Sequence, residues 1–280
     1  MNPWELCAED LRRHYRAAAV VFYGSCLRDR TADGLLDFYV LVDRYSDAMG
    51  NAAALGAWLL PPNVYSHVLG TARAKVAVMR VDEFLSDLGA NRFTTTLSAR
   101  FAQPCAIVHA RDNALRARLE AGFVTAANTC IQRTLPLMPP QFTALDLWRR
   151  VLSESFAAEL RPERPERIRS LVDGTAAFYA AATERVLGAP SDGVYRIVPR
   201  RGARAGATLA WCLRRILGKT LNALRLIKAA FTFQGGIDYA AWKIGRHTGI
   251  MLPVTDDDRK KPLRAGLRLF ARSLRLNAIR

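Results

Sequence analysis

Apolar and polar positions in the first 112 residues form short apolar runs separated by amphipathic stretches. Runs rich in valine, leucine and aromatic residues predict four strands, at 19–23, 36–42, 75–81 and 104–110. Helical spacing predicts one helix over residues 3–17 and another directly after Val81. Strands that alternate with helices in this way predict a small α/β sheet.

From residue 113 the pattern changes to helical spacing with little strand signal. It predicts helices at 113–132, 143–160 and 166–187. A connector rich in glycine, proline and arginine follows at 188–207. The chain is therefore expected to be α/β (α+β) in three parts: an α/β domain over 1–112, a helical second domain over 113–195, for which a winged helix is one candidate, and a helical region over 196–280.

Two basic amphipathic helices are predicted in the last part. In the first, apolar residues share one side of the helix: Leu209, Leu213, Ile216, Leu217, Leu221, Leu224, Ile227 and Phe231. The opposite side carries the basic residues Arg214, Arg215, Lys219, Arg225 and Lys228. The second helix, within 263–276, repeats this design. Opposed apolar and basic faces are typical of helices that lie in a membrane interface.

The charge of the protein is concentrated in the same region. The 280 residues carry a formal charge of +16, yet residues 1–195 hold 22 basic and 21 acidic side chains. Residues 196–280 hold 19 basic and 4 acidic side chains. Such an excess indicates a polyanionic partner, either an anionic membrane surface or nucleic acid. Because proteins that bind single strands interleave aromatic and basic residues, the segregated helices favour the membrane surface.

Cysteine usage and hydropathy indicate the compartment. Five cysteines occur without paired spacing, as expected for reduced thiols in the cytosol. The N-terminus carries early charges where a signal peptide needs an apolar core. The one long uncharged stretch, 48–72, contains Pro61 and Pro62, so we expect no membrane-spanning segment. The expected location is the cytoplasm, peripheral on the inner face of the membrane.

The stretch that suggests chemistry runs from Val20 to Asp43. A strand ends at a Gly24-Ser25 pair, and a carboxylate, Asp37, lies near the start of the next strand. Glycine permits close approach of a triphosphate, a serine hydroxyl can donate to a phosphate oxygen, and a carboxylate can hold a divalent metal. The alternative is an ordinary β-loop-β unit in which Asp37 is a strand-edge residue.

Several motifs, taken in order, resemble the mitochondrial-type phosphatidate cytidylyltransferases, the translocator assembly and maintenance family of the nucleotidyltransferase superfamily. They are YGSCLRDRTADGLLDFYVLVD from Tyr23, NVYSH around Tyr65, AKVAVMRVDEFLSDL with Lys75, SARFAQP with Arg100, and SFAAELR with Glu159. The resemblance implies a nucleotidyltransferase-fold domain, a helical domain and a basic tail. It also implies Mg²⁺ and a reaction of CTP with phosphatidate that gives CDP-diacylglycerol and pyrophosphate.

The resemblance also assigns roles to residues. Asp37, Lys75 and Arg100 are the expected catalytic residues. Nucleotide contacts are expected from Gly24, Ser25, Tyr65 and Lys75, and Mg²⁺ ligands from Asp37 and Glu159.

The chain departs from the family pattern at several positions. Cys26 follows Gly-Ser where the family has glycine, Ala99 replaces a glycine, and Glu159 replaces an aspartate. A Tyr-Gly pair is replaced by Val76 and Ala77. Two alternatives therefore stand beside the enzyme of lipid activation. One is a nucleotidyltransferase-like protein that acts on or binds nucleic acid, and the other is a catalytically lapsed member that only binds nucleotide or lipid.

Overall fold

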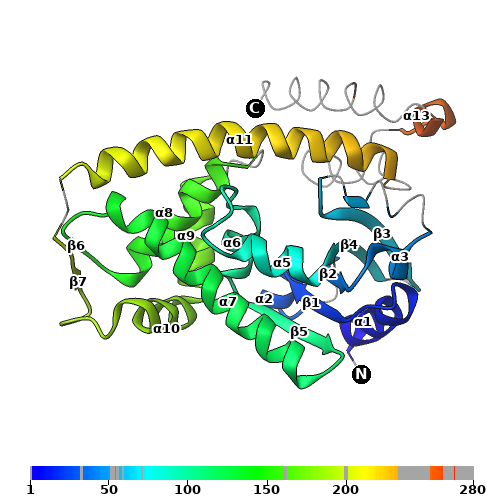
Figure 1. Ribbon diagram of the computed structural model, residues 1–280, viewed down its shortest axis with the longest axis horizontal. Coiled ribbons are helices and arrows are strands. Elements are labelled where there is room, and N and C mark those ends of the chain that lie inside the picture. Colours follow the sequence, from blue (N-terminus) through cyan, green and yellow to red (C-terminus); the bar gives the residue numbers. More distant parts are fainter. Residues whose placement is uncertain are drawn as a thin grey trace.

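The computed structural model (Figure 1) describes most of the chain. The described residues are 2–31, 34–50, 54, 57–58, 60–70, 72–159, 163–198, 201–232, 253–260 and 268. The second predicted basic helix, within 263–276, lies outside these residues except for position 268. The described part contains helices and a mixed sheet, which confirms the expected α+β composition.

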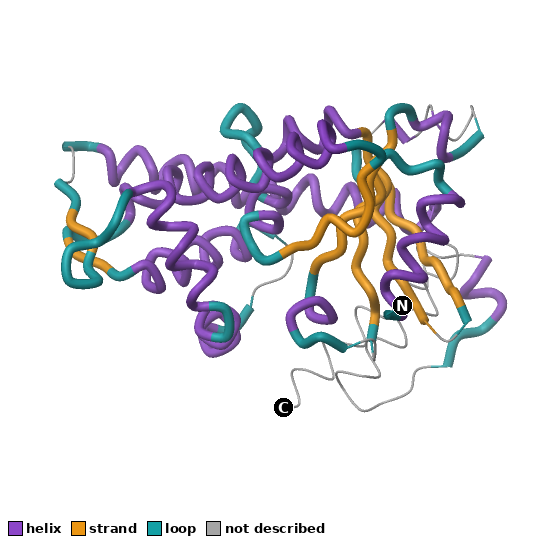
Figure 2. Tube along the Cα trace, turned by 90° about the horizontal axis from the view of Figure 1, so that it is seen from below, coloured by secondary structure: helices purple, strands orange, loops and turns teal. Residues whose placement is uncertain are grey.

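The N-terminal part is built on a five-stranded sheet in the order β3-β4-β2-β1-β5. The bounds of the strands are β1 Ala19–Tyr23, β2 Leu35–Val42, β3 Asn63–Leu69, β4 Ala72–Arg80 and β5 Cys105–Ala110. Strands β2 and β4 pair in parallel and the other neighbours are antiparallel. Figure 2 shows the strands side by side in one sheet. The predicted strands are therefore present, and β3 is an additional strand in the long uncharged stretch.

Helices cover both faces of this sheet. On one face, α1 (Pro3–His14) packs its buried Leu11 with Phe38 and other residues of β1, β2 and β4. The other face meets α5 (Val81–Leu88), α6 (Thr96–Phe101) and α7 (Asn113–Thr134). Two short helices, α2 (Ser25–Arg28) and α3 (Tyr45–Ala48), follow β1 and β2. Alternating side chains of each strand thus enter two separate cores.

A helical unit follows α7. Its elements are η1 Leu135–Leu137, β6 Gln141–Phe142, α8 Ala144–Ala157, α9 Pro165–Asp173, α10 Ala176–Leu187 and β7 Tyr195–Arg196, and β6 pairs with β7. The helix predicted at 166–187 is two helices, because the chain breaks at Gly174-Thr175. One cluster of buried side chains runs from the sheet through α7 to α8 and α10. The predicted boundary at 112 coincides with the N-cap of α7, but the core continues across it.

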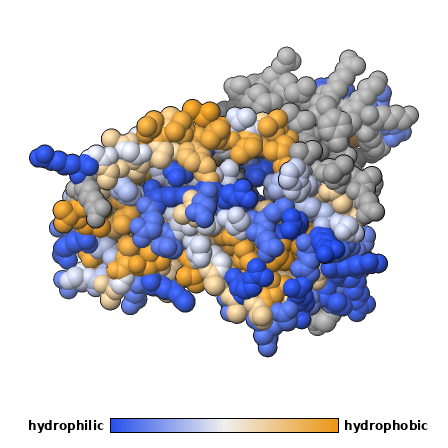
Figure 3. Space-filling view, viewed as in Figure 1, coloured by the Kyte–Doolittle hydropathy of each residue, from blue (hydrophilic) through white to orange (hydrophobic). Residues whose placement is uncertain are grey.

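The long helix α11 (Ala203–Thr232) crosses the helical unit and reaches the edge strand β3 (Figure 1). Its predicted apolar side faces outward: Leu209, Leu213, Ile216, Leu217 and Leu224 are exposed. Figure 3 shows a hydrophobic band along the upper edge of the molecule, where α11 lies in Figure 1. Within the described residues, which also include the short α13 (Asp256–Lys260), no helix combines the length and the hydropathy needed to cross a bilayer.

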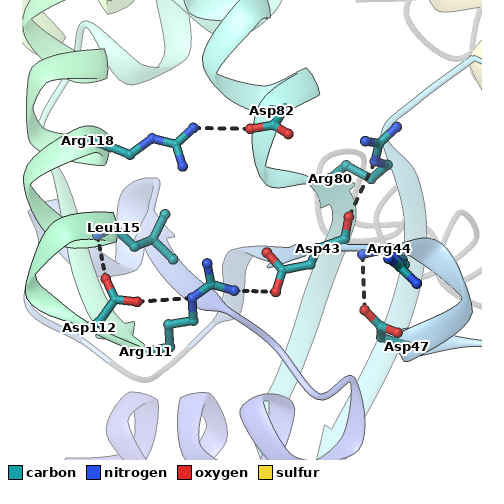
Figure 4. A network of polar contacts seen from close by, with 9 residues as sticks. All are labelled: Asp43, Arg44, Asp47, Arg80, Asp82, Arg111, Asp112, Leu115 and Arg118. Carbon is teal, nitrogen blue, oxygen red and sulfur yellow. Dashed lines mark hydrogen bonds and ion pairs between the residues drawn. The ribbon is translucent and has the colours of Figure 1, made fainter.

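A surface network of ion pairs ties together the end of the sheet where β2 stops (Figure 4). Arg111 pairs with Asp43, which follows β2, and with Asp112, which caps α7 by accepting from the Leu115 amide at 2.7 Å. A separate pair joins Arg118 of α7 to Asp82 of α5. Asp43 lies six residues from Asp37, about 20 Å along an extended strand, so this network is remote from the Gly24-Ser25 loop.

Candidate functional site

The Gly24-Ser25 loop leaves β1 in a conformation that favours glycine. Gly24 has φ +93° and ψ −163°, which side-chain-bearing residues rarely adopt. A β-carbon at this position would also lie 2.8 Å from Asp37 Oδ2. Both the backbone angle and the adjacent carboxylate therefore exclude a side chain. Ser25, the next residue, is the first residue of α2 and is exposed.

Strand register brings the sequence-predicted charges to one end of the sheet. Asp37 of β2 lies opposite Tyr23 of β1 on one side and opposite Lys75 of β4 on the other. The buried Tyr39, two residues from Asp37, belongs to the core beneath α5 and α6, so Asp37 projects from the same face. Asp37 and Lys75 are both half-buried. The loop and short helix between Tyr23 and Leu35 thus join two paired strand ends.

Arg100 reaches this end of the sheet from α6. Its Nη1 donates to the Tyr39 hydroxyl at 3.0 Å, and its guanidinium carbon lies 5.4 Å from the centre of the Tyr23 ring. Burial opposes the charge of Arg100, but Tyr39, Tyr23, Glu159 and Asp37 outweigh it and raise the pKa of the guanidinium. Arg100 is therefore a permanent cation held between aromatic rings and near two carboxylates.

These residues surround a cavity of about 230 Å³ between the sheet, α6 and the α8–α9 region. Six of the seven predicted site residues line it: Gly24, Ser25, Asp37, Lys75, Arg100 and Glu159. Glu159 comes from the segment just after α8, so the helical unit supplies one wall. Residues far apart in the sequence thus meet at one place.

Tyr65 is the predicted residue that does not line this cavity. In the antiparallel β3–β4 pair Ser66 lies opposite Lys75, and Tyr65 lies opposite Val76, whose side chain enters the core beneath α1. The Tyr65 hydroxyl lies 3.8 Å from Met49 Sδ, and burial raises its pKa. Because neighbouring residues of a strand face opposite ways, Tyr65 projects from the other face of the sheet.

The cavity also has charged residues that the sequence did not single out: Arg28 from α2, Arg167 from α9, and Glu163 before α9. Phe156 and Leu171 add an apolar part to the same wall. Arg28 lies one helical turn after Ser25, and this spacing could have indicated it. Arg167 lies in a charged segment that looks like an ordinary solvent-exposed helix face, so only the packing of α9 reveals its position.

The carboxylates that line the cavity suit Mg²⁺, a hard cation that usually keeps several water ligands. Asp37 and Glu159 line the same cavity, while no group of three or more His, Cys, Asp or Glu suited to a metal occurs in the described part of the chain. Mg²⁺ is commonly held by one or two carboxylates together with phosphate oxygens and water. Asp37 and Glu159 are therefore two carboxylates of the type that can hold Mg²⁺.

Comparisons with known proteins do not identify a family for this chain. No protein-family model matches the chain, and a search of curated proteins gives no significant match.

Proposed function

We propose that this protein is a nucleotidyltransferase that transfers CMP from CTP to phosphatidate and forms CDP-diacylglycerol and pyrophosphate. The main support is one cavity lined by Gly24, which has no side chain, by Ser25 with its hydroxyl and by the Asp37 carboxylate. Lys75 and Arg100 add two cations at the same place. The observed mixed sheet is compatible with a nucleotidyltransferase fold, which is part of the proposal.

In the proposed complex the CTP triphosphate lies along the Gly24-Ser25 loop. The missing side chain lets phosphate oxygens approach the backbone, and the Ser25 hydroxyl donates to one of them. Lys75 and Arg100 neutralise charge that moves to the leaving pyrophosphate. Asp37 and Glu159 would hold Mg²⁺, which when bound supplies charge neutralisation of the phosphates. Positioning and electrostatics account for most of the catalysis.

The acceptor step needs no proton removal. A phosphate oxygen of phosphatidate, already anionic at neutral pH, attacks the α-phosphorus of CTP, and the bond from that phosphorus to the pyrophosphate oxygen breaks. Arg28 of α2 and Arg167 of α9, which both line the cavity, are the proposed contacts of the acceptor phosphate. Phe156 and Leu171 suit the adjoining apolar part of the lipid.

The proposed location is the cytoplasmic side of an anionic membrane, without a spanning segment. The outward stripe of α11 offers apolar side chains for the headgroup region, from Leu209 to Leu224. The excess of 15 positive charges over residues 196–280 complements anionic lipid, at about 1 kcal/mol for each basic residue near the surface.

The deciding experiment incubates the full chain with Mg²⁺, phosphatidate vesicles and each α-³²P-labelled NTP in turn. Lipid-extractable label is expected from CTP, and γ-labelled CTP should give none. Asp37→Asn should abolish the transfer because the amide keeps the volume and loses the charge. Asp43→Asn is the matched control, since Asp43 follows the far end of the same strand. Label recovered in RNA, or no transfer of label to lipid from any nucleotide, would contradict the proposal.

A further inference from the structure

Helix α11 touches the backbone beside the cavity through a glycine. Gly218 is buried, and a β-carbon added there would overlap the carbonyl oxygen of Ala158. Ala158 is the residue directly before Glu159, which lines the cavity. The absence of a side chain at Gly218 therefore sets how closely α11 approaches the segment that carries Glu159.

A buried carboxylate that pairs with two arginines fixes the same contact. The Arg215 guanidinium lies 2.5 Å from Glu154 Oε2, and Arg150 lies 2.8 Å from Oε1 of the same carboxylate. The Glu154 side chain is 5% exposed. Arg150 and Arg215 thus share this carboxylate, and their own side chains are 46% and 43% exposed. Arg215 thus ties α11 to the last turns of α8, close to Glu159.

The same helix also holds the segment before α6. Trp211 is buried and its Nε1 donates to the Arg133 carbonyl at 3.0 Å. Arg133 donates through its guanidinium to the carbonyls of Ala90, Arg92 and Thr94. These contacts fix the chain that enters α6, and α6 carries Arg100.

Arg214 strengthens this second contact. Its guanidinium carbon lies 4.8 Å from the Phe93 ring centre and 5.4 Å from that of Trp211. Burial, and then the charge of Arg214, lower the pKa of Arg133 to about 10. The guanidinium groups of Arg133 and Arg214 are thus held close together, the first by carbonyl oxygens and the second by aromatic rings. This arrangement depends on the position of α11.

We infer that α11 is a positioning element for the cavity: Trp211, Arg215 and Gly218 hold Arg100 and Glu159 in their relative places on two different walls. The roles of Arg100 and Glu159 rest on the proposed function, whereas the contacts between α11 and the segments that carry these two residues do not. Ser25 and Asp37 lie on the sheet side of the cavity, away from these contacts. Displacement of α11 should therefore impair the chemical step more than binding of CTP.

The test uses two glycines of the same helix. Gly218→Ala places a methyl group against Ala158, whereas Gly206→Ala adds the same group where nothing lies within 4 Å. For CMP transfer, Gly218→Ala should lower kcat roughly tenfold or more and change the KM for CTP less than about threefold. Gly206→Ala should leave both unchanged. Equal kinetics of the two variants would overturn the inference.

Amide hydrogen exchange measures the link without relying on activity. Gly218→Ala should speed exchange in peptides covering 96–101 and 154–159, and Gly206→Ala should not. If the wild type transfers no CMP but this difference appears, the proposed function fails and the positioning role stands. Faster exchange confined to α11 would refute the positioning role.

A second pair of variants covers the case in which Gly218→Ala does not fold. Arg215→Lys keeps a cation for Glu154, while Arg215→Met keeps the apolar stem and removes the charge. Lysine should restore most of the kcat that methionine loses, and exchange over 154–159 should follow the same order. Equal behaviour of lysine and methionine would show that the ion pair does not position the site.

Discussion

Gly24 and Asp37 approach each other so closely that a β-carbon at residue 24 would lie 2.8 Å from Asp37 Oδ2. Gly24→Ala should therefore displace the carboxylate and strain the backbone, which has φ +93°. We expect CMP transfer to fall at least about 100-fold, with a loss of roughly 1–3 kcal/mol in the free energy of unfolding. Chemical denaturation and the vesicle assay measure the two effects. Gly70→Ala is a control with positive φ in open space, and an equal loss of activity there would contradict the interpretation.

Ser25→Ala should weaken nucleotide binding without abolishing transfer. One hydrogen bond to a charged group contributes roughly 1.5–3 kcal/mol, equivalent to about a 10- to 100-fold rise in the KM for CTP. The residue is exposed, so the melting temperature should stay unchanged. A fall in the melting temperature together with the activity would identify Ser25 as structural instead.

The outward stripe of α11 should bind anionic vesicles. Leu213→Ser with Ile216→Ser should reduce binding to phosphatidate vesicles, measured by flotation, by at least about 100-fold, because each side chain buried in the membrane contributes about 1.5–3 kcal/mol. Val198→Ser, at a residue 93% exposed and outside the helix, is the control and should bind normally. Removal of 259–280 should weaken flotation as well. Unchanged flotation of the double variant, or tighter salt-dependent binding to RNA, would exclude the lipid surface as the partner.

Thiol alkylation should distinguish Cys212 from the buried cysteines. Cys212 is exposed on α11, whereas burial raises the pKa of Cys7 to about 11 and the pKa values of Cys105 and Cys130 to about 12. A raised pKa leaves less thiolate at pH 8, so these three should react much more slowly with iodoacetamide. Mass spectrometry of the native protein measures each site. Rapid modification of Cys130 would contradict the packing of α7.

Much of the sheet was predictable because its central strands are apolar and bounded by loops. The strand predicted at 36–42 is β2 with one extra residue, and its position put Asp37 next to the Gly24-Ser25 loop. Strand β3 was missed since it is an edge strand with Asn63, Ser66 and His67 interrupting its apolar pattern. The six-residue α6 was missed because so short a helix has little periodicity.

The direction of α11 was not predictable from its amphipathic pattern. The pattern separates two faces but does not say which faces water, and the basic face of a helix is usually the exposed one. Here Arg215 pairs with a buried carboxylate and Arg214 packs on two aromatic rings, so these two arginines turn toward the protein, while Lys219 stays exposed. Those partners are distant in sequence, which is also why the contribution of Arg167 to the cavity was missed.

Because one core runs from the sheet into the helical unit, the protein cannot be divided between them without exposing apolar side chains. A fragment ending at Asp112, the predicted domain boundary, would keep Phe84, Leu97 and Phe101 but lose the α7 side chains that cover them. It would also lose Glu159 and the α9 wall of the cavity. Autonomous folding is therefore expected only from fragments that retain α7 to α10, and a proteolytic cut in the loop before α7 should leave two pieces that stay associated until denaturant is added.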